Sequence, residues 1–213
     1  TSILEGVIGG ETLGAFAYVE RQSRYALNDC KTSATSSGDG YTLNGEKVVV
    51  FNGENADKLV VLARTSGEQF DAHGLSLFLV DANAQGVSKV LYPMMDAQRV
   101  ANITFDNVQL GADALLGDAG SALEVVNAVI RDALLALASE AVGIMATLNA
   151  KTLEYTKTRE QFGVPIGSFQ VLQHRMVDML MAVRECQSMT LMTAGKIMSE
   201  DAMRKYGGSD INQ

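Results

Sequence analysis

Few side chains in the sequence combine a reactive type with a spacing that could support catalysis. Asp132 and Glu140 lie eight residues apart in a segment of helical periodicity, and a carboxylate can take a proton from a substrate. Helix surfaces carry solvated acids routinely, so we favour a structural role for both. His174 could titrate beside a cofactor, but a lone histidine next to Arg175 is more often a surface or packing residue. The catalytic base therefore stays unknown.

The cysteines and histidines do not suggest a metal site. The chain has two of each, and Cys30 and Cys186 lie far apart without a neighbouring histidine at ligand spacing. We interpret each cysteine as a small buried hydrophobic residue. No metal is expected.

Composition narrows the classes of protein that fit. The net charge is -8 and the sequence pI is about 4.8, which opposes the basic surface that nucleic acid requires. No apolar run approaches the roughly 20 uncharged residues of a membrane span, and residues 1–10 lack the basic start of a signal peptide. We expect a cytoplasmic protein with no nucleic-acid partner and no membrane insertion.

The first half of the chain reads as a multi-stranded antiparallel β-domain. Its short segments are rich in β-branched and aromatic residues and are separated by Gly, Asn and Asp. Asn44-Gly45 is the pair favoured in a two-residue type I′ hairpin, so it predicts a turn between strands at 42–43 and 46–51. Such a domain would form a small barrel or sandwich. Further strands are predicted at residues 13–19, 59–63, 75–80, 87–92 and 102–105.

The second half has the period of α-helices. Apolar residues recur every three or four positions from Leu123 to Leu148, which predicts one long helix over residues 121–158. Residues 161–167 contain two glycines and Pro165 and should break it. Ser168 would then cap a second helix that ends near Met198, with residues 204–213 as a loop. Two long apolar helices need partners, as in an up-down four-helix bundle.

The segment between these helices has the most distinctive order of residues. Taken alone, it favours a turn with a solvated arginine and a buried phenylalanine. From Arg159 to Gln173, however, it closely resembles the R-x-Q-F-G-x-P-I-x-x-F-Q-x-x-Q segment of acyl-CoA dehydrogenases. The first half resembles the same family's middle domain at residues 40–47, 52–53, 56–57, 74, 78–80 and 105–108.

This resemblance implies a mixed fold with β and α in separate domains. Residues 1–117 would form the middle β-domain, and residues 118–213 would form the start of the C-terminal helical domain, which is incomplete here. The family's N-terminal helical domain is absent from this stretch. Residues 14–25 are also similar to the small subunit of pimeloyl-CoA dehydrogenase-type enzymes.

The family chemistry uses FAD, an acyl-CoA substrate and an electron-transfer flavoprotein. By resemblance, Arg159 would pair with the FAD pyrophosphate of a neighbouring subunit, because a guanidinium fork suits paired oxygens. Phe162 would pack on the adenine side, and amides would come from Gln161, Gln170 and Gln173. The matching positions near the flavin ring are Tyr18, Val19 and Phe51; those near the substrate are Tyr25, Arg131 and Leu134.

Several positions depart from the family pattern. Val19 replaces a hydroxyl that would bond the flavin, and Val49-Val50-Phe51 replaces a Trp-x-Thr that packs on it, although Phe51 could partly substitute by stacking. The family's usual catalytic Glu lies beyond residue 213. Some relatives carry it at the position of Ala133, and alanine cannot take a proton.

Two functions therefore remain open. In the first, the chain is a flavoenzyme subunit that desaturates an acyl-CoA in fatty acid or dicarboxylic acid degradation. The alternative is a non-catalytic partner that completes the FAD site of a catalytic neighbour. A homo- or heterotetramer is expected in either case, and an oxidase that uses oxygen ranks well below both.

Overall fold

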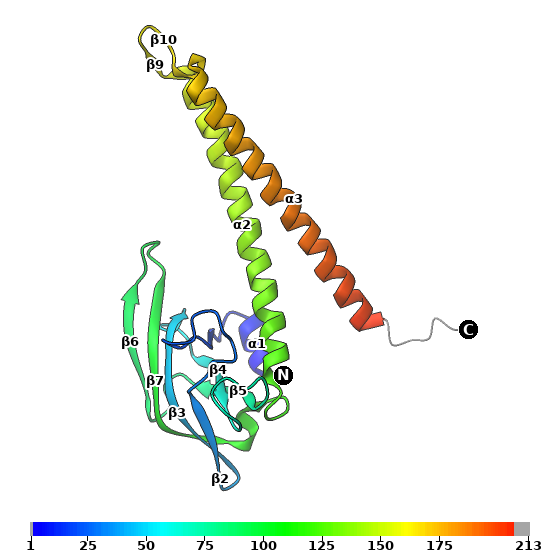
Figure 1. The fold of residues 1–213 in the computed structure, drawn as a ribbon. Coiled ribbons are helices and arrows are strands. Elements are labelled where there is room, and N and C mark those ends of the chain that lie inside the picture. The colour runs from blue at the N-terminus through cyan, green and yellow to red at the C-terminus, as the bar shows by residue number, and fades with distance from the viewer. Residues whose placement is uncertain (1, 207–213) are drawn as a thin grey trace, which may run out of the picture. The chain divides into compact units, whose positions relative to one another are not determined.

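The computed structural model describes residues 2–206 and divides into two compact units, Thr1–Ala128 and Val129–Gln213, which are treated separately (Figure 1). The first unit holds most of the strands, and the second holds the long helices. The predicted combination of an antiparallel β-domain with long helices is confirmed. The predicted domain boundary after Gly117 stays a prediction.

The β unit contains eight strands and one short helix. Its helix is α1 (Ser2–Ile8), which the sequence analysis did not predict. The strands are β1 (Gly14–Ala17), β2 (Ser33–Ser37), β3 (Gly40–Phe51), β4 (Lys58–Arg64), β5 (Leu75–Asp81), β6 (Val87–Pro93), β7 (Arg99–Gly111) and β8 (Leu115–Leu116), with a 3₁₀ turn η1 (Ala112–Ala114) before β8.

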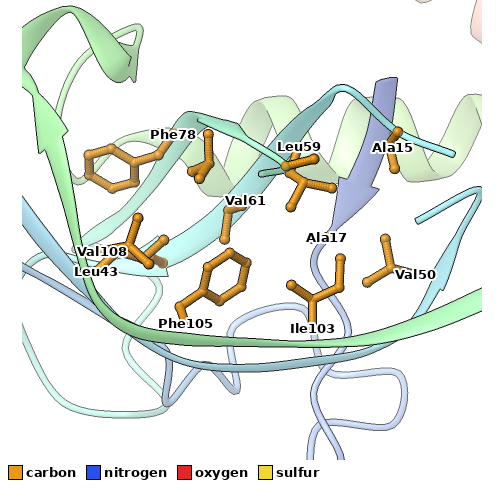
Figure 2. Packing of buried hydrophobic residues seen from close by; sticks show 14 of the residues in the cluster. Ala15, Ala17, Leu43, Val50, Leu59, Val61, Phe78, Ile103, Phe105 and Val108 are labelled. Atoms are coloured by element: carbon orange, nitrogen blue, oxygen red, sulfur yellow. The ribbon is translucent and has the colours of Figure 1, made fainter. Parts of the chain in front are cut away.

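The strands form one curled sheet. Their order is β6-β7-β3-β2-β4-β5-β8, with β1 added in parallel to β4. Side chains from β3 and β7 meet side chains from β4 and β5 across the interior (Figure 2). Successive residues of a strand point to opposite faces, so one side of each strand can supply the core. The largest fully buried apolar side chains there are Phe78, Leu43, Leu59 and Ile103.

The predicted Asn44-Gly45 hairpin turn is wrong, because both residues lie inside the continuous strand β3. The turn that precedes β3 is instead at Gly38-Asp39, since Ser37 pairs with Gly40. At Asn44 the register between β3 and β7 shifts, and the Asn44 Oδ1 accepts the Asn107 backbone N–H at 2.8 Å. A positive-φ asparagine, Asn107, here belongs to a bulge rather than to a turn.

Gly45 has a structural reason to be glycine that is separate from any turn. Its φ is 145°, and a Cβ added there would lie 2.6 Å from the Thr32 Oγ1. The close approach of Thr32 to β3 therefore excludes a side chain. The same Asn-Gly pair that favours a hairpin locally is used for strand packing because tertiary contacts decide the outcome.

Several other strand predictions need adjustment. Strand β2 was not predicted because its sequence, Ser-Ala-Thr-Ser-Ser, has no apolar alternation. Strand β7 is longer than the predicted 102–105, and β1 is shorter than the predicted 13–19. Pairing with β3 stabilises both β2 and β7 through backbone hydrogen bonds that side-chain patterns do not reveal.

The long helices match the predicted periodicity. Helix α2 (Ala122–Thr158) agrees with the predicted 121–158, and α3 (Gln170–Tyr206) extends past the predicted end at Met198. Residues 204–206 are therefore helical, and the rest of the predicted C-terminal loop lies outside the described residues. Between the helices are β9 (Glu160–Gln161), β10 (Val164–Pro165) and the 3₁₀ turn η2 (Ile166–Ser168).

Ser168 does not cap α3, which corrects the sequence-based expectation. Its hydroxyl donates to the Pro165 carbonyl oxygen at 2.7 Å, inside η2. Leu172 and Gln173 donate their backbone N–H groups to the Phe169 carbonyl, so the first turn of α3 begins one residue later than predicted. Ser168 is the last residue of η2, and its hydroxyl is already bonded within that 3₁₀ turn, so it does not cap the helix that follows.

Within the helical unit, α2 and α3 run antiparallel. Thr156 and Met176 are in contact near the connection, with the Thr156 Oγ1 3.4 Å from the Met176 Sδ, and Arg131 and Glu200 approach to 3.7 Å near the other ends. Many apolar side chains of both helices remain exposed among the described residues, as the predicted need for bundle partners requires. They include Leu137, Ile144, Leu148, Val177, Leu180 and Leu191.

Helix α2 is long and strongly apolar. It contains an 18-residue window of mean hydropathy 1.5, so its length and composition would allow it to cross a membrane. The core helix of a soluble bundle passes the same test. The expectation of no membrane insertion stays a prediction.

Candidate functional site

The residues predicted to bind cofactor and substrate fall into separate groups. Tyr18, Val19, Tyr25 and Phe51 belong to the β unit. A second group lies at the connection between α2 and α3, in the helical unit, and Arg131, Ala133 and Leu134 lie further back along α2. The predicted residues are thus divided between the two units.

A bulge in β3 connects two positions of the β-unit group, Val19 and Phe51. The register with β7 shifts between Lys47 and Val50, and Val49 has a φ of 53°. A β-branched residue rarely takes a positive φ, so this backbone is strained. The bulge lets the Val48 N–H leave β7 and donate to the Val19 carbonyl at 2.9 Å. The segment that contains Val19 is thereby attached to β3.

Asn102 of β7 holds the strained bulge in place. Its Oδ1 accepts both the Val49 N–H at 3.1 Å and the Tyr92 hydroxyl at 3.0 Å. Just beyond the bulge, the Phe51 side chain is 52% exposed and free to stack on a planar ligand. Tyr18 stacks on Phe16 with ring centroids 4.7 Å apart. The two predicted aromatic positions therefore differ, because Phe51 is exposed whereas Tyr18 is half-buried.

Lys47, just before this bulge, forms a buried ion pair with Glu20. The Lys47 Nζ is 2.7 Å from the Glu20 Oε1, and the two side chains are 0% and 3% exposed. Burial alone would raise the pKa of Glu20, but the Lys47 ammonium and the hydrogen bonds from Lys47, Gln22 and Thr32 outweigh it and lower that pKa to about 2. Glu20 is therefore ionised throughout the neutral range.

Cys30 completes the same buried cluster. Its thiol is 3.3 Å from the Glu20 Oε1 and 3.6 Å from the Lys47 Nζ. Burial raises the pKa of Cys30 to about 11, so it is a neutral thiol near pH 7. The expectation that both cysteines are buried holds for Cys30 and is wrong for Cys186, which is exposed on α3.

The predicted substrate residue Tyr25 lies at the tip of the loop between β1 and β2. Its side chain is 97% exposed, and the preceding Arg24 has a φ of 47°. Arg21 at the start of the loop pairs with Glu46 at 3.1 Å. The loop thus presents Tyr25 outward, where a ligand can reach it.

The second group is built on the tight β9–β10 hairpin. Phe162 and Gly163 form its turn, with φ values of 54° and 78°. Consecutive positive φ values are typical of a type I′ turn, which glycine adopts easily and phenylalanine does not. Phe162 is 93% exposed and meets Phe169 edge-on at 6.3 Å. The predicted buried phenylalanine of a simple turn is wrong, because this side chain points into solvent.

Polar residues also belong to the same connection. Arg159 follows α2 directly, and its backbone is fixed by bonds from its N–H to the Tyr155 carbonyl and from the Ile166 N–H to its own carbonyl. Within residues 2–206 no hydrogen bond or ion pair engages the side chains of Arg159, Gln161 or Gln170, all of which are exposed. Five donors of a guanidinium are thus available to an anion.

Gln173 is the exception in this group. Its Nε2 donates to the Gly167 carbonyl at 2.9 Å, so this amide stabilises the connection itself. Its amide oxygen, the Oε1, remains as an acceptor. The geometry therefore gives Gln173 a structural use in addition to the predicted ligand contact.

The predicted substrate residues on α2 are differently placed. Arg131 binds Asp132, with its NH2 2.9 Å from the carboxylate, and approaches Glu200. An anionic ligand would have to compete with these two carboxylates. Leu134 is 60% exposed and Ala133 carries no polar atom, so neither supplies a proton acceptor.

The sequence analysis missed Glu20, Lys47 and Asn102, which hold the β-unit group together. A signal for Lys47 was available: it precedes Val48-Val49-Val50 in an apolar run, and a charged residue there needs a buried partner. Nothing local identifies Glu20 or Asn102 as that partner or as the acceptor for Val49.

Two family models match the chain in order. The acyl-CoA dehydrogenase middle domain matches residues 15–108, and the acyl-CoA dehydrogenase C-terminal domain matches residues 122–209. Together they span most of the sequence.

Individual proteins give the same picture. A short-chain specific acyl-CoA dehydrogenase of Megasphaera elsdenii is 28% identical over 96% of this chain and 56% of its own length. The structure of butyryl-CoA dehydrogenase from Megasphaera elsdenii has a TM-score of 0.80 at 26% identity, covering 98% of this chain and 53% of that one. A structure titled the FAD complex of PigA has a TM-score of 0.81 at 26% identity, with 98% and 53% covered. The chain thus spans about half the length of these relatives.

Proposed function

The chain belongs to the acyl-CoA dehydrogenase family, and from that premise we propose that it is part of an FAD-dependent subunit that desaturates an acyl-CoA thioester. The observation that carries this proposal is the connection between α2 and α3, where the Phe162 ring is exposed and the Arg159 side chain has no hydrogen bond or ion pair within the described residues. An aromatic face and a guanidinium fork suit the adenine and the pyrophosphate of FAD.

The two groups of side chains, each within its own unit, suit FAD unequally. At the α2–α3 connection, Arg159, Gln161 and Gln170 offer unused polar groups. Near the β3 bulge, Val19 has no side-chain donor and its carbonyl already accepts the Val48 N–H, which leaves Phe51 as the group open for stacking. FAD, when bound, would accept the hydride from the substrate β-carbon. The chain's own residues bind and orient it.

The described residues supply no convincing general base for removal of the substrate α-proton. Asp132 is engaged by Arg131 on the exposed surface of α2, and the family's alternative position for the base is Ala133. Glu20 is ionised but is buried against Lys47, so a substrate cannot reach it. The general base of this proposal therefore stays unassigned among the described residues.

A second function from a different class is favoured by the same inequality. In it, this chain is a non-catalytic partner whose Arg159, Phe162 and Gln170 complete the FAD site of a catalytic neighbour. The exposed, unpaired side chains at the α2–α3 connection support it, as does the engagement of Arg131 by acids. A homo- or heterotetramer, a cytoplasmic location and electron transfer to an electron-transfer flavoprotein belong to both proposals.

One experiment separates these functions. The full-length protein is purified alone and after co-expression with the protein of its neighbouring gene, and the visible flavin spectrum is recorded before and after an acyl-CoA is added. A yellow protein that bleaches alone is a self-sufficient dehydrogenase. Flavin and bleaching that require the neighbour identify the partner role, and absence of flavin from both preparations refutes the proposal.

Arg159→Ala tests the site directly. We expect the assembled oligomer to retain FAD about tenfold less tightly, because one charge-assisted contact with the pyrophosphate is lost. Flavin content after dialysis measures this. Arg175→Ala, which removes another exposed arginine from α3, is the matched control. Unchanged flavin retention in Arg159→Ala would contradict the assignment.

A further inference from the structure

One carboxylate at the start of the loop that carries Tyr25 accepts two backbone hydrogen bonds from the end of that loop. The Glu20 Oε2 accepts the Lys31 N–H at 2.8 Å, and the Oε1 accepts the Thr32 N–H at 2.9 Å. Glu20 precedes the loop, whereas Lys31 and Thr32 follow it. A single side chain therefore closes the neck of residues 21–30, and we name this arrangement the Glu20 clamp.

The clamp uses the full acceptor capacity that an ionised carboxylate has. Besides the two backbone groups, the Oε1 accepts the Lys47 ammonium at 2.7 Å and the Oε2 accepts the Gln22 Nε2 at 2.8 Å. Each oxygen thus takes one backbone donor and one nitrogen side-chain donor, and the Cys30 thiol adds a longer contact of 3.3 Å to the Oε1. An amide in its place would present a donor at one of these oxygens, so glutamine cannot satisfy the same set.

The loop beyond the neck is braced on its inner side. Ser23 bonds the backbone of Glu20 through its Oγ, and the buried Asp29 accepts the amides of Gln22 at 3.2 Å and Gln69 at 2.6 Å. The tip that contains Tyr25 is exposed. An exposed aromatic residue on a braced loop is preorganised for a ligand, because its ordering entropy is lost before binding.

The clamp also reaches the flavin-facing segment. The Lys47 Nζ donates to the Tyr18 carbonyl at 3.4 Å, and the adjacent Val48 N–H donates to the Val19 carbonyl. The same buried pair therefore fixes the backbone of Tyr18 and Val19 against the β3 bulge while Glu20 closes the loop. Both predicted β-unit contacts depend on one ion pair.

We propose that Glu20 is a positioning residue, which with Lys47 holds the Tyr25 loop and the Tyr18–Val19 backbone in a fixed relation for substrate and flavin; this rests on the proposed function. Replacement of a buried ion pair by apolar residues is often neutral for stability, so stability alone does not require the pair. Its conformational role is what the hydrogen-bond pattern supports.

The test compares Glu20→Gln with the double variant Glu20→Gln/Lys47→Met in the full-length protein. The single variant leaves the Lys47 charge buried without a counter-ion, which lowers stability whatever the role of the clamp. The double variant removes that charge. Glu54→Gln, which breaks the surface pair with Arg99, is the matched control.

The first readout is limited trypsin digestion, which needs no ligand. Cleavage after Arg24 in the loop is measured against cleavage after Arg159 in the same sample, since Arg159 lies in the other unit. We expect about a tenfold faster relative cleavage after Arg24 in both Glu20 variants, because local opening governs proteolysis of a native loop. Glu54→Gln should match the wild type.

The second readout is the dissociation constant for FAD and the flavin absorption spectrum, measured for the same proteins with their partner present. We expect the double variant to unfold at a higher temperature than Glu20→Gln, because the uncompensated Lys47 charge is gone, yet to bind FAD as weakly as the single variant and with a shifted spectrum. If the ion pair served stability alone, the FAD affinity and the flavin spectrum of the double variant would recover together with its unfolding temperature.

The outcomes for the two proposals are distinguishable. Wild-type protection after Arg24 in the stable double variant would overturn the clamp, because Asp29 and Gln69 would then suffice to hold the loop. If the wild type binds no FAD in any preparation, the proposed function fails, and the trypsin comparison still decides whether Glu20 closes the loop.

Discussion

At the scale of single residues, Arg64 illustrates how one side chain organises two loops. It is the last residue of β4, and its guanidinium donates to six backbone carbonyls at 2.9–3.3 Å. Two acceptors lie in the loop before β2 and four in the loop between β4 and β5. They are the carbonyls of Asn28, Cys30, Ser66, Gln69, Asp71 and His73.

We expect Arg64→Lys to lower the free energy of unfolding by about 2–3 kcal/mol, because three ammonium donors cannot satisfy carbonyls arranged around a planar fork. Urea denaturation of the wild type and the variant measures the difference. Arg175→Lys makes the same chemical change at an exposed position on α3 and should alter stability by less than about 0.5 kcal/mol. A similar small effect at Arg64 would show that water replaces these bonds.

At the scale of elements, the β9–β10 hairpin combines backbone strain with an exposed aromatic side chain. Phe162 has a φ of 54°, which costs a residue other than glycine on the order of 1 kcal/mol. Its ring is exposed apart from its edge-on approach to Phe169. Such a combination is consistent with a turn retained for binding, because folding alone would favour glycine there.

Phe162→Gly should therefore separate stability from binding. We expect the free energy of unfolding to change by no more than about 1 kcal/mol, because relief of backbone strain offsets the lost edge contact. The affinity for FAD should fall about tenfold, since the adenine loses its aromatic neighbour. Thermal unfolding and flavin titration measure the two effects.

The control is Phe70→Gly, which removes another exposed phenylalanine, one without a positive φ. It should leave the affinity for FAD unchanged. Equal affinities of Phe162→Gly and wild type for FAD would separate the hairpin from cofactor binding.

Prediction of elements from the sequence succeeded where the periodicity was long. The apolar stripe of α2 fixed its length because many turns contribute to one pattern. The hairpin turn predicted at Asn44-Gly45 is wrong because pairing of β3 with β7 and packing against Thr32 outweigh the local preference for a turn. Strand β2 was not predicted because backbone pairing with β3, rather than a pattern of its own side chains, makes it a strand.

At the scale of the whole molecule, we expect the free energy of unfolding to fall at low pH because Glu20 becomes protonated. The folded-state pKa of Glu20 is about 2, below the ordinary value of 4.5 that the unfolded chain would have. A lowered pKa means that the carboxylate stabilises the fold above pH 4.5 and loses this contribution as the pH falls from 4.5 toward 2. The contribution is on the order of 3 kcal/mol.

Urea midpoints measured between pH 6 and pH 2 would test this expectation, with pH values chosen to bracket the two pKa values. The wild type should lose stability over the acid range more steeply than Glu20→Gln/Lys47→Met, which has no carboxylate at that position. Parallel curves for the two proteins would mean that other acids account for acid unfolding.

The sequence by itself determined the fold class, the long helix α2 and the family, because periodicity and the ordered residues from Arg159 to Gln173 are properties of the chain. The tertiary structure decided how the predicted site residues are held. Glu20, Lys47 and Asn102 are distant in sequence from one another or from their hydrogen-bond partners, and their hydrogen bonds arise only when the strands pair. A buried charge needs a specific partner, and the fold determines which one it meets.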